Sequence, residues 1–139
     1  MNDDAPTFPR TLAERMERRV EINNPDKGNE RLGRILDRMN ADDELYALWI
    51  AANVTAITRL GMTDHGPVHV KIVVNIAIRL FQLLEEAGVA PSVVKDHGLE
   101  RDDAAVVIAL AALLHDTGMS IHRAEHEGFS LFVAQDKIR

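Results

Sequence analysis

The sequence predicts an all-α protein, and three observations carry this prediction. Apolar residues recur at steps of three and four along most of the chain, which is the spacing of one face of a helix. Proline, glycine and acidic residues stand at the ends of these stretches, where helices begin and end. The chain has 139 residues, of which 46% are hydrophobic, enough for one domain with its own core. We therefore expect a single helical domain of about six to seven helices over residues 1–139.

The N-terminal part, residues 1–40, is expected to form two helices. The first is entered through Pro9 and ends near Asn23, because proline is favoured in the first turn of a helix. Its apolar face consists of Leu12, Met16 and Val20. The second helix runs to Asn40, with the apolar stripe Leu32, Ile35, Leu36 and Met39.

Two longer helices are predicted next. Asp42, Asp43 and Glu44 favour the start of the third helix, because negative charge stabilises a helix N-terminus, and Gly61 ends it. The fourth helix begins at Pro67 and ends before Gly88. Its apolar stripe, which we expect to pack in the core, consists of Val70, Val73, Val74, Ala77, Leu80, Phe81 and Leu84.

The C-terminal part begins with a short segment that starts at Pro91 and ends at His97 and Gly98. A helix that is apolar on nearly all sides follows, from Glu100 to His115, and such a helix belongs at the centre of a core. A buried strand is disfavoured there by the many alanines and by the length of the segment. A last helix is predicted to start near Ile121 and to continue past Asp136.

Composition narrows the classes of function. The net charge of −6 disfavours binding to a nucleic acid polymer but permits a small anionic ligand held by a metal. The chain has no cysteine, so nitrogen and oxygen atoms must hold any metal. Its acidic N-terminus does not resemble a signal peptide, and its longest apolar run, residues 104–114, is too short to span a bilayer. We expect a cytoplasmic protein without membrane contact.

Histidines and aspartates gather in two clusters, each at the end of a predicted helix. The first cluster contains Asp64, His65 and His69, and the second contains His115, Asp116, His122 and His126. Neutral imidazoles and carboxylates suit borderline divalent ions such as Fe, Mn, Zn or Co. A site with only three or four protein ligands keeps positions open for water and substrate.

The two clusters resemble the H…HD…D pattern of the HD-domain superfamily of metal-dependent phosphohydrolases. Residues 69–73, His-Val-Lys-Ile-Val, are similar to the helix of the family's first histidine, and residues 111–118, Ala-Ala-Leu-Leu-His-Asp-Thr-Gly, to its core signature. The resemblance covers roughly residues 42–133, so residues 41–139 would form an HD-like helical core. It implies that His69, His115 and Asp116 hold one or two divalent ions (Mn, Fe, Zn, Ni, Co or Mg). The family's last ligand is a distal aspartate, and Asp136 is the only aspartate after Asp116.

The same resemblance implies roles for neighbouring residues. His122 and His126 are four residues apart, so on a helix they would share a face and could bind phosphate or protonate the leaving oxygen. The alternative is a solvated helix face. The cations nearest in sequence to the proposed ligands are Lys71 and Arg123, which would pair with a phosphate; Lys71 fits the polar side of its helix equally well.

The other members of the first cluster have less direct roles. His65 is the rival of His69 as a ligand, but it precedes Pro67 and is expected in a turn. Asp64 would orient one of the imidazoles by accepting a hydrogen bond from it. His97 lies before Gly98 in a connecting segment and is expected at the surface.

The leading expectation is a phosphohydrolase that attacks a phosphomonoester, nucleotide or phosphodiester with metal-activated water. One alternative is a catalytically inactive HD-fold module that binds a nucleotide, regulates or dimerises. Another is a metal-assisted hydrolase or oxygenase of a non-phosphate substrate, which the all-α context disfavours. The expected partners are a small phosphorylated substrate and a second copy of the chain, because the last helix would expose Phe129, Phe132 and Val133.

Overall fold

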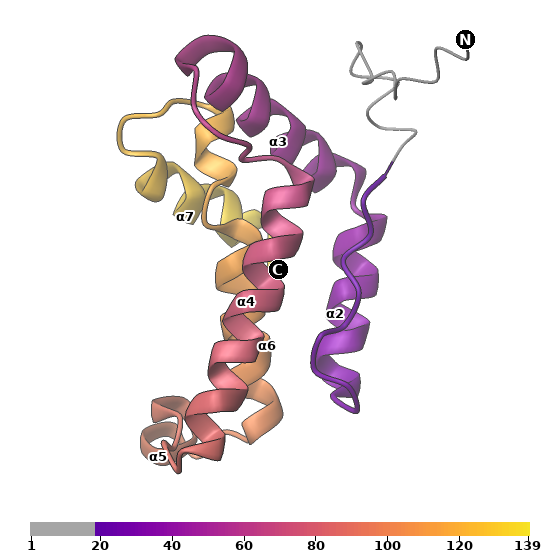
Figure 1. Cartoon of the computed structure of the whole chain (residues 1–139), viewed down its shortest axis with the longest axis vertical. Coiled ribbons are helices and arrows are strands. Elements are labelled where there is room, and N and C mark those ends of the chain that lie inside the picture. The colour runs from indigo at the N-terminus through magenta and orange to yellow at the C-terminus, as the bar shows by residue number, and fades with distance from the viewer. Residues whose placement is uncertain (1–18) are drawn as a thin grey trace, which may run out of the picture.

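A computed structural model describes residues 19–139 of the chain (Figure 1). The described residues form six α-helices and no strand, which confirms the all-α prediction. These helices are α2 (Glu30–Ala41), α3 (Asp43–Asn53), α4 (Pro67–Glu86), α5 (Ser92–His97), α6 (Arg101–Leu114) and α7 (His126–Lys137). A π-helical stretch, Val54–Arg59, extends α3, and a 3₁₀ turn, Thr117–Ser120, follows α6.

The first predicted helix lies mostly outside the described residues. Its last part, residues 19–24, is not helical, so the prediction is wrong for that stretch. The backbone N–H and C=O of Ile22 bond to the side-chain amide of Asn40, both at 3.0 Å, and the N–H of Val20 donates to the hydroxyl of Tyr46. Because other side chains satisfy these backbone groups, the segment runs extended beside α2.

The predicted helix boundaries are largely confirmed by their capping interactions. Asp42 accepts a hydrogen bond from the N–H of Leu45 at 2.9 Å and caps α3, as its acidic start predicts. Glu100 and Asp103 form a capping box at the start of α6. Gly61, with φ of +64°, ends the helical stretch that begins with α3, because this left-handed conformation is easy only for glycine.

Helices α4 and α6 lie side by side at the centre of the fold (Figure 1). The contact pairs branched residues of α4 with small residues of α6, so the two helices approach closely. The fully buried residues include Val70, Val74 and Ile78 on α4 and Ala105, Ala109 and Leu113 on α6. The central position expected for the apolar helix is therefore confirmed.

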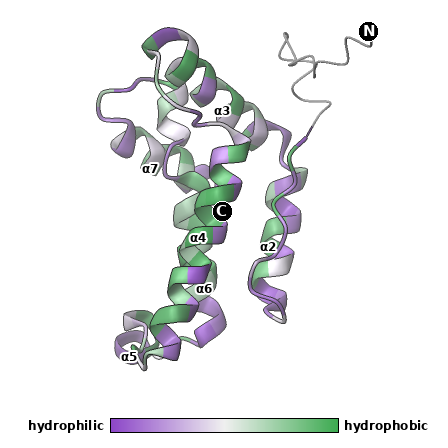
Figure 2. Cartoon of the chain, in the orientation of Figure 1, coloured by the Kyte–Doolittle hydropathy of each residue, from purple (hydrophilic) through white to green (hydrophobic). Residues whose placement is uncertain are grey.

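The opposite face of α4 is also apolar, which the sequence analysis did not anticipate (Figure 2). Leu80 and Leu84, which we placed in the core, are 55% and 52% exposed, because the helix turns them away from α6. They adjoin the exposed side chains of Val68, Ile72 and Ile76.

By length and composition, α4 and the segment Arg101–Ser120 could each cross a membrane. Core helices of soluble proteins pass the same test, so this is weak evidence for a membrane span.

The last helix begins later than predicted. Glu125 has a φ of +60°, which breaks the helical path, and α7 starts only at His126. His122 lies in the preceding loop, where its Nδ1 accepts a hydrogen bond from the N–H of Ala124. His122 and His126 therefore do not share a helix face, contrary to the prediction.

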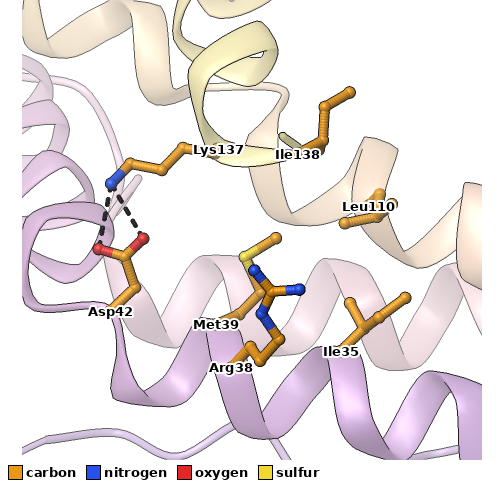
Figure 3. Close-up of a pocket in the computed structure, with 7 residues that line it drawn as sticks. All are labelled: Ile35, Arg38, Met39, Asp42, Leu110, Lys137 and Ile138. Carbon is orange, nitrogen blue, oxygen red and sulfur yellow. Dashed lines mark hydrogen bonds and ion pairs between the residues drawn. The ribbon is translucent and has the colours of Figure 1, made fainter.

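Helix α7 runs back along α6, and side-chain contacts stabilise this position at both ends of α7. Near its start, Ser130 is buried against the C-terminal end of α6. Near its end, the ammonium group of Lys137 lies 2.9 Å from Asp42 Oδ2 (Figure 3). The same group lies 2.8 Å from Glu44 Oε2. These contacts hold the start of α7 beside the residues that follow α6.

Candidate metal centre

The candidate metal centre lies where three helix ends meet. His69 is in the first turn of α4, His115 and Asp116 follow α6, and His126 opens α7. Within residues 19–139, one group has the ligands and spacing to hold a metal ion: each of His69, His115 and Asp116 offers a ligand atom within 4.8 Å of the others. The structure thus brings together the three residues that the HD resemblance implies, although their assignment as ligands remains a prediction.

The distances around the Asp116 carboxylate match the spacing of atoms around one ion. Oδ2 lies 3.0 Å from Nε2 of His115 and 3.4 Å from Nε2 of His69. Two ligand atoms bonded at about 2.1 Å to the same ion lie about 3.0 to 3.4 Å apart for right-angled to tetrahedral arrangements. Nε2 of His126 approaches the other oxygen, Oδ1, at 3.5 Å.

The other ring nitrogen fixes the direction in which these imidazoles can bind. Nδ1 of His115 lies 2.8 Å from the carbonyl oxygen of Ala112, and Nδ1 of His126 lies 3.0 Å from that of Arg123. A carbonyl only accepts, so in both rings Nδ1 carries the proton and Nε2 presents its lone pair in the neutral form. Histidines that bind metals are commonly held in this way.

Lone pairs therefore face a carboxylate, an arrangement that needs a cation. Asp116 is buried, with 8% of its surface exposed, and neutral His115 and His126 would turn acceptor atoms toward its oxygens. A proton or a metal ion between them relieves the repulsion. Nitrogen and carboxylate ligands without sulfur fit a borderline divalent ion, so the residues present fit a metal.

The pKa values express the same electrostatic conflict. The hydrogen bond to Asp116 raises the pKa of His115 although burial opposes it. Burial by itself would raise the pKa of Asp116, but the hydrogen bond and charge of His115, with the charges of His65 and His69, hold it below its ordinary value. Burial lowers the pKa of His69, which keeps this imidazole neutral and able to bind a metal.

The residues after α6 position the pair His115-Asp116. The Ser130 hydroxyl donates to the carbonyl of His115 at 2.6 Å and accepts from the N–H of Gly118 at 2.9 Å. Gly118 allows this approach, because a Cβ there would lie 2.1 Å from the carbonyl oxygen of His126. A glycine at position 118 is therefore needed to bring α7 against the candidate site.

On the opposite side, Asn53 orders the loop that leads to His69. Its amide donates to Asp64 Oδ2 at 3.0 Å and accepts from the N–H of His65 at 2.9 Å. Asp64 Oδ1 in turn accepts from the N–H groups of Gly66 and His69. We expected Asp64 to bind an imidazole; it caps the start of α4 instead, because two backbone donors converge on its carboxylate.

The other candidate residues from the sequence lie outside the group of three proposed ligands. The ring of His65 stacks on that of His69, with centroids 5.1 Å apart, so His65 belongs to the cluster although it lies in the irregular segment before α4. Lys71, two residues after His69, projects from another side of α4, because residues two apart on a helix do not share a face. Arg123 and Asp136 are exposed, and the described metal group includes neither of them.

The comparison with known proteins identifies a relative in an archaeon. Over 102 residues, 73% of its length, the chain is 38% identical to the uncharacterized protein MJ1020 of Methanocaldococcus jannaschii. The chain spans 39% of the length of that relative. No family model matches the chain, and no solved structure matches it. The functional argument therefore rests on the geometry of the site and on the sequence motif.

Proposed function

We propose that the protein is a metal-dependent phosphohydrolase of the HD type that acts on a phosphomonoester, a nucleotide or a phosphodiester. The observation that carries the proposal is the arrangement around Asp116, where the Nε2 atoms of His69 and His115 lie 3.4 and 3.0 Å from one carboxylate oxygen. The resemblance of residues 69–73 and 111–118 to the HD signature supports a phosphate ester as substrate.

In this proposal His69, His115 and Asp116 hold the divalent ion. The ion, when bound, activates water and withdraws charge from the phosphoryl oxygens. The protein has to direct the two Nε2 atoms toward one point. The carbonyl of Ala112 orients the ring of His115 by accepting a hydrogen bond from its Nδ1–H, and partial burial favours the neutral form of His69.

His126 is the group best placed to handle a proton. Its Nδ1–H is directed to the carbonyl of Arg123, and its Nε2 faces Asp116 Oδ1 from the start of α7. In its protonated form, Nε2 donates a hydrogen bond to a phosphate oxygen and can pass the proton to the leaving oxygen. His122, exposed in the loop before α7, is less suited, since its Nδ1 accepts a backbone N–H.

The test is hydrolysis of p-nitrophenyl phosphate and of bis-p-nitrophenyl phosphate by the full chain with Mn²⁺, Fe²⁺ or Zn²⁺. We expect metal-dependent release of nitrophenol that His69→Ala abolishes. His97→Ala is the matched control, because His97 is exposed at the end of α5 and outside the cluster. Equal hydrolysis by His69→Ala would refute the proposal, and metal binding without hydrolysis would favour the inactive HD-fold module.

A further inference from the structure

An apolar groove runs beside the candidate metal centre, between α6 and α7. Its volume is about 510 Å³, which lies within the range of about 300 to 1,000 Å³ usual for small-molecule sites. Val107 and Leu114 of α6 form one wall, and Leu131 and Ala134 of α7 form the other. His115, one of the proposed metal ligands, also lines the groove. The groove therefore reaches one residue of the candidate metal centre.

The lining of the groove is partly polar at one end and apolar at the other. Its polar lining groups are His115, Glu127 and Ser130, and all three belong to the part of the fold near Asp116. The lining toward Val107 and Ile138 is entirely apolar. Among residues 19–139, the lining contains one acidic side chain, Glu127, and no lysine or arginine. A second phosphate or a carboxylate would therefore meet no cation in the groove.

The apolar end has a limited length. Leu110 and Ile138 line both the groove and a smaller hollow beyond it, whose other side holds Arg38 and the ion pair of Lys137 with Asp42 (Figure 3). From Val107 to Leu114 the wall of α6 rises about 10 Å, at 1.5 Å per residue. This length suits a short aliphatic chain.

We propose that this groove binds the uncharged, apolar arm of the substrate, so that the preferred phosphoester is the monophosphate of an aliphatic alcohol. The inference rests on the proposed function, because the phosphate is placed at His69, His115 and Asp116. His115 belongs to both the candidate metal centre and the groove, and the apolar wall of α6 begins one residue away at Leu114. A polar arm would leave that wall in water, whereas an aliphatic arm covers it.

The experiment is calorimetric titration of the full chain, with Mn²⁺, by methyl, butyl and octyl phosphate below their micellar concentrations. Burial of each methylene should tighten binding about fourfold. The heat capacity change of binding should become more negative as the alkyl chain lengthens. An affinity that does not change from methyl to octyl phosphate would overturn the proposal.

A matched pair of variants locates the bound chain. Ala111 is exposed on the groove wall, so Ala111→Phe fills the groove without entering the core. It should abolish the gain in affinity from methyl to octyl phosphate. Ala90→Phe, at an exposed position outside the groove, should behave as wild type. Wild-type chain-length dependence in Ala111→Phe would contradict the assignment.

The outcomes separate this inference from the proposed function. One outcome is that the affinity rises from methyl to octyl phosphate by the same factor without Mn²⁺ and in His115→Ala. In that case the groove proposal is supported and the proposed metal-dependent function fails. If methyl phosphate needs Mn²⁺ but chain length has no effect, the groove proposal alone fails. Sedimentation velocity tests the other occupant: a ligand-free dimer that Ala111→Phe dissociates would assign the groove to a second copy of the chain and overturn the proposal.

Discussion

At the N-terminal end of α6, Arg101 lies between Asp26 and Glu85, with Nη2 2.8 Å from Glu85 Oε2 and Nη1 bonded to Asp26. The amides of Asn29 and Gln82 donate the remaining hydrogen bonds to Asp26. At the C-terminal end, the equally buried Asp116 faces imidazole nitrogens instead. The first carboxylate has a permanent cation, and the second has partners that are neutral or charged according to pH.

This difference separates a structural site from a functional one. The guanidinium of Arg101 is always charged, so the network with Asp26 and Glu85 is complete within the chain. Around Asp116, residues 19–139 supply ligands but no fixed positive charge, and a proton or a metal ion has to complete the set. Buried carboxylates alone do not identify a site; what identifies it is which partners the fold gives them.

Loss of the cation at the N-terminal end should have the largest effect on stability. Arg101→Leu leaves Asp26, 5% exposed, without its charged partner, and we expect the free energy of unfolding to fall by about 3 kcal/mol. Urea denaturation measures it. Arg34→Leu, which removes an exposed arginine 3.8 Å from Glu30, should change stability by less than about 0.5 kcal/mol. The folded Arg101→Leu protein should still bind the metal. Loss of metal binding in this variant would mean that the sites at the two ends of α6 are not independent.

Replacement of Gly118 should disturb the C-terminal end by a different route. In Gly118→Ala the added Cβ meets backbone atoms of His126 and Ser130, at 2.1 and 2.5 Å, so α7 must shift. We expect a loss of stability of about 2 kcal/mol and a displaced His126. Gly128→Ala, with open space at its Cβ, is the matched control. Unchanged stability in Gly118→Ala would show that α7 does not pack here as described.

A smaller effect is expected from Asn53→Ala, which removes both bonds from the amide to Asp64 and to the backbone of His65. The loop that positions His69 loses its anchor, so Mn²⁺ affinity should fall about tenfold while stability falls by about 1 kcal/mol. Titration with Mn²⁺ measures the first and urea denaturation the second. Asn75→Ala, whose amide bonds only to Lys71 of its own helix, should leave both values near wild type.

The smallest effect should be the pH dependence of the free energy of unfolding of the metal-free protein. It should come from the residues at the C-terminal end of α6. His115 has a raised pKa, so its contribution to stability is complete below its ordinary value of 6.5 and is lost as pH rises through the raised pKa. His69 has a lowered pKa, so stability is lost as pH falls from 6.5 toward that pKa. We expect the free energy of unfolding to be greatest near pH 6.5.

Three variants sharpen this expectation. His115→Ala should remove the decrease above the maximum, and His69→Ala should remove the decrease below it. Arg101→Leu should lower the whole curve without changing its shape between pH 6 and 8, because a raised arginine pKa lies far above that range. A flat pH profile of the wild type over this range would contradict the electrostatic description of Asp116.

The sequence predicted the helices where local chemistry determines them. Apolar spacing and end signals identified α4 and α6, and the His-Asp pair after α6 identified the residues that the fold brings near His69. The sequence placed the start of α7 too early. The helical path is broken by the left-handed backbone of Glu125, and a sequence signals such a conformation only when the residue is glycine. It also missed Asn53, since only the tertiary fold brings this mid-helix amide to the loop before α4.

The outer face of α4 shows a second limit of sequence reasoning. Leu80 follows the apolar spacing of its helix as regularly as the fully buried Ile78, yet it is more than half exposed. Spacing identifies apolar faces, but when a helix has two of them it does not say which one packs in the core. The same applies to the groove, whose walls come from helices that meet only in the folded chain.

The measurement that tests the metal centre most directly is the metal content of the untagged chain after dialysis against Mn²⁺, by elemental mass spectrometry, beside His115→Ala and His97→Ala. We expect close to one ion per wild-type chain and per His97→Ala chain, and almost none in His115→Ala with its helical circular dichroism retained. Equal metal in His115→Ala, or none in the wild type, would contradict the claim that the imidazoles around Asp116 are arranged to hold a cation.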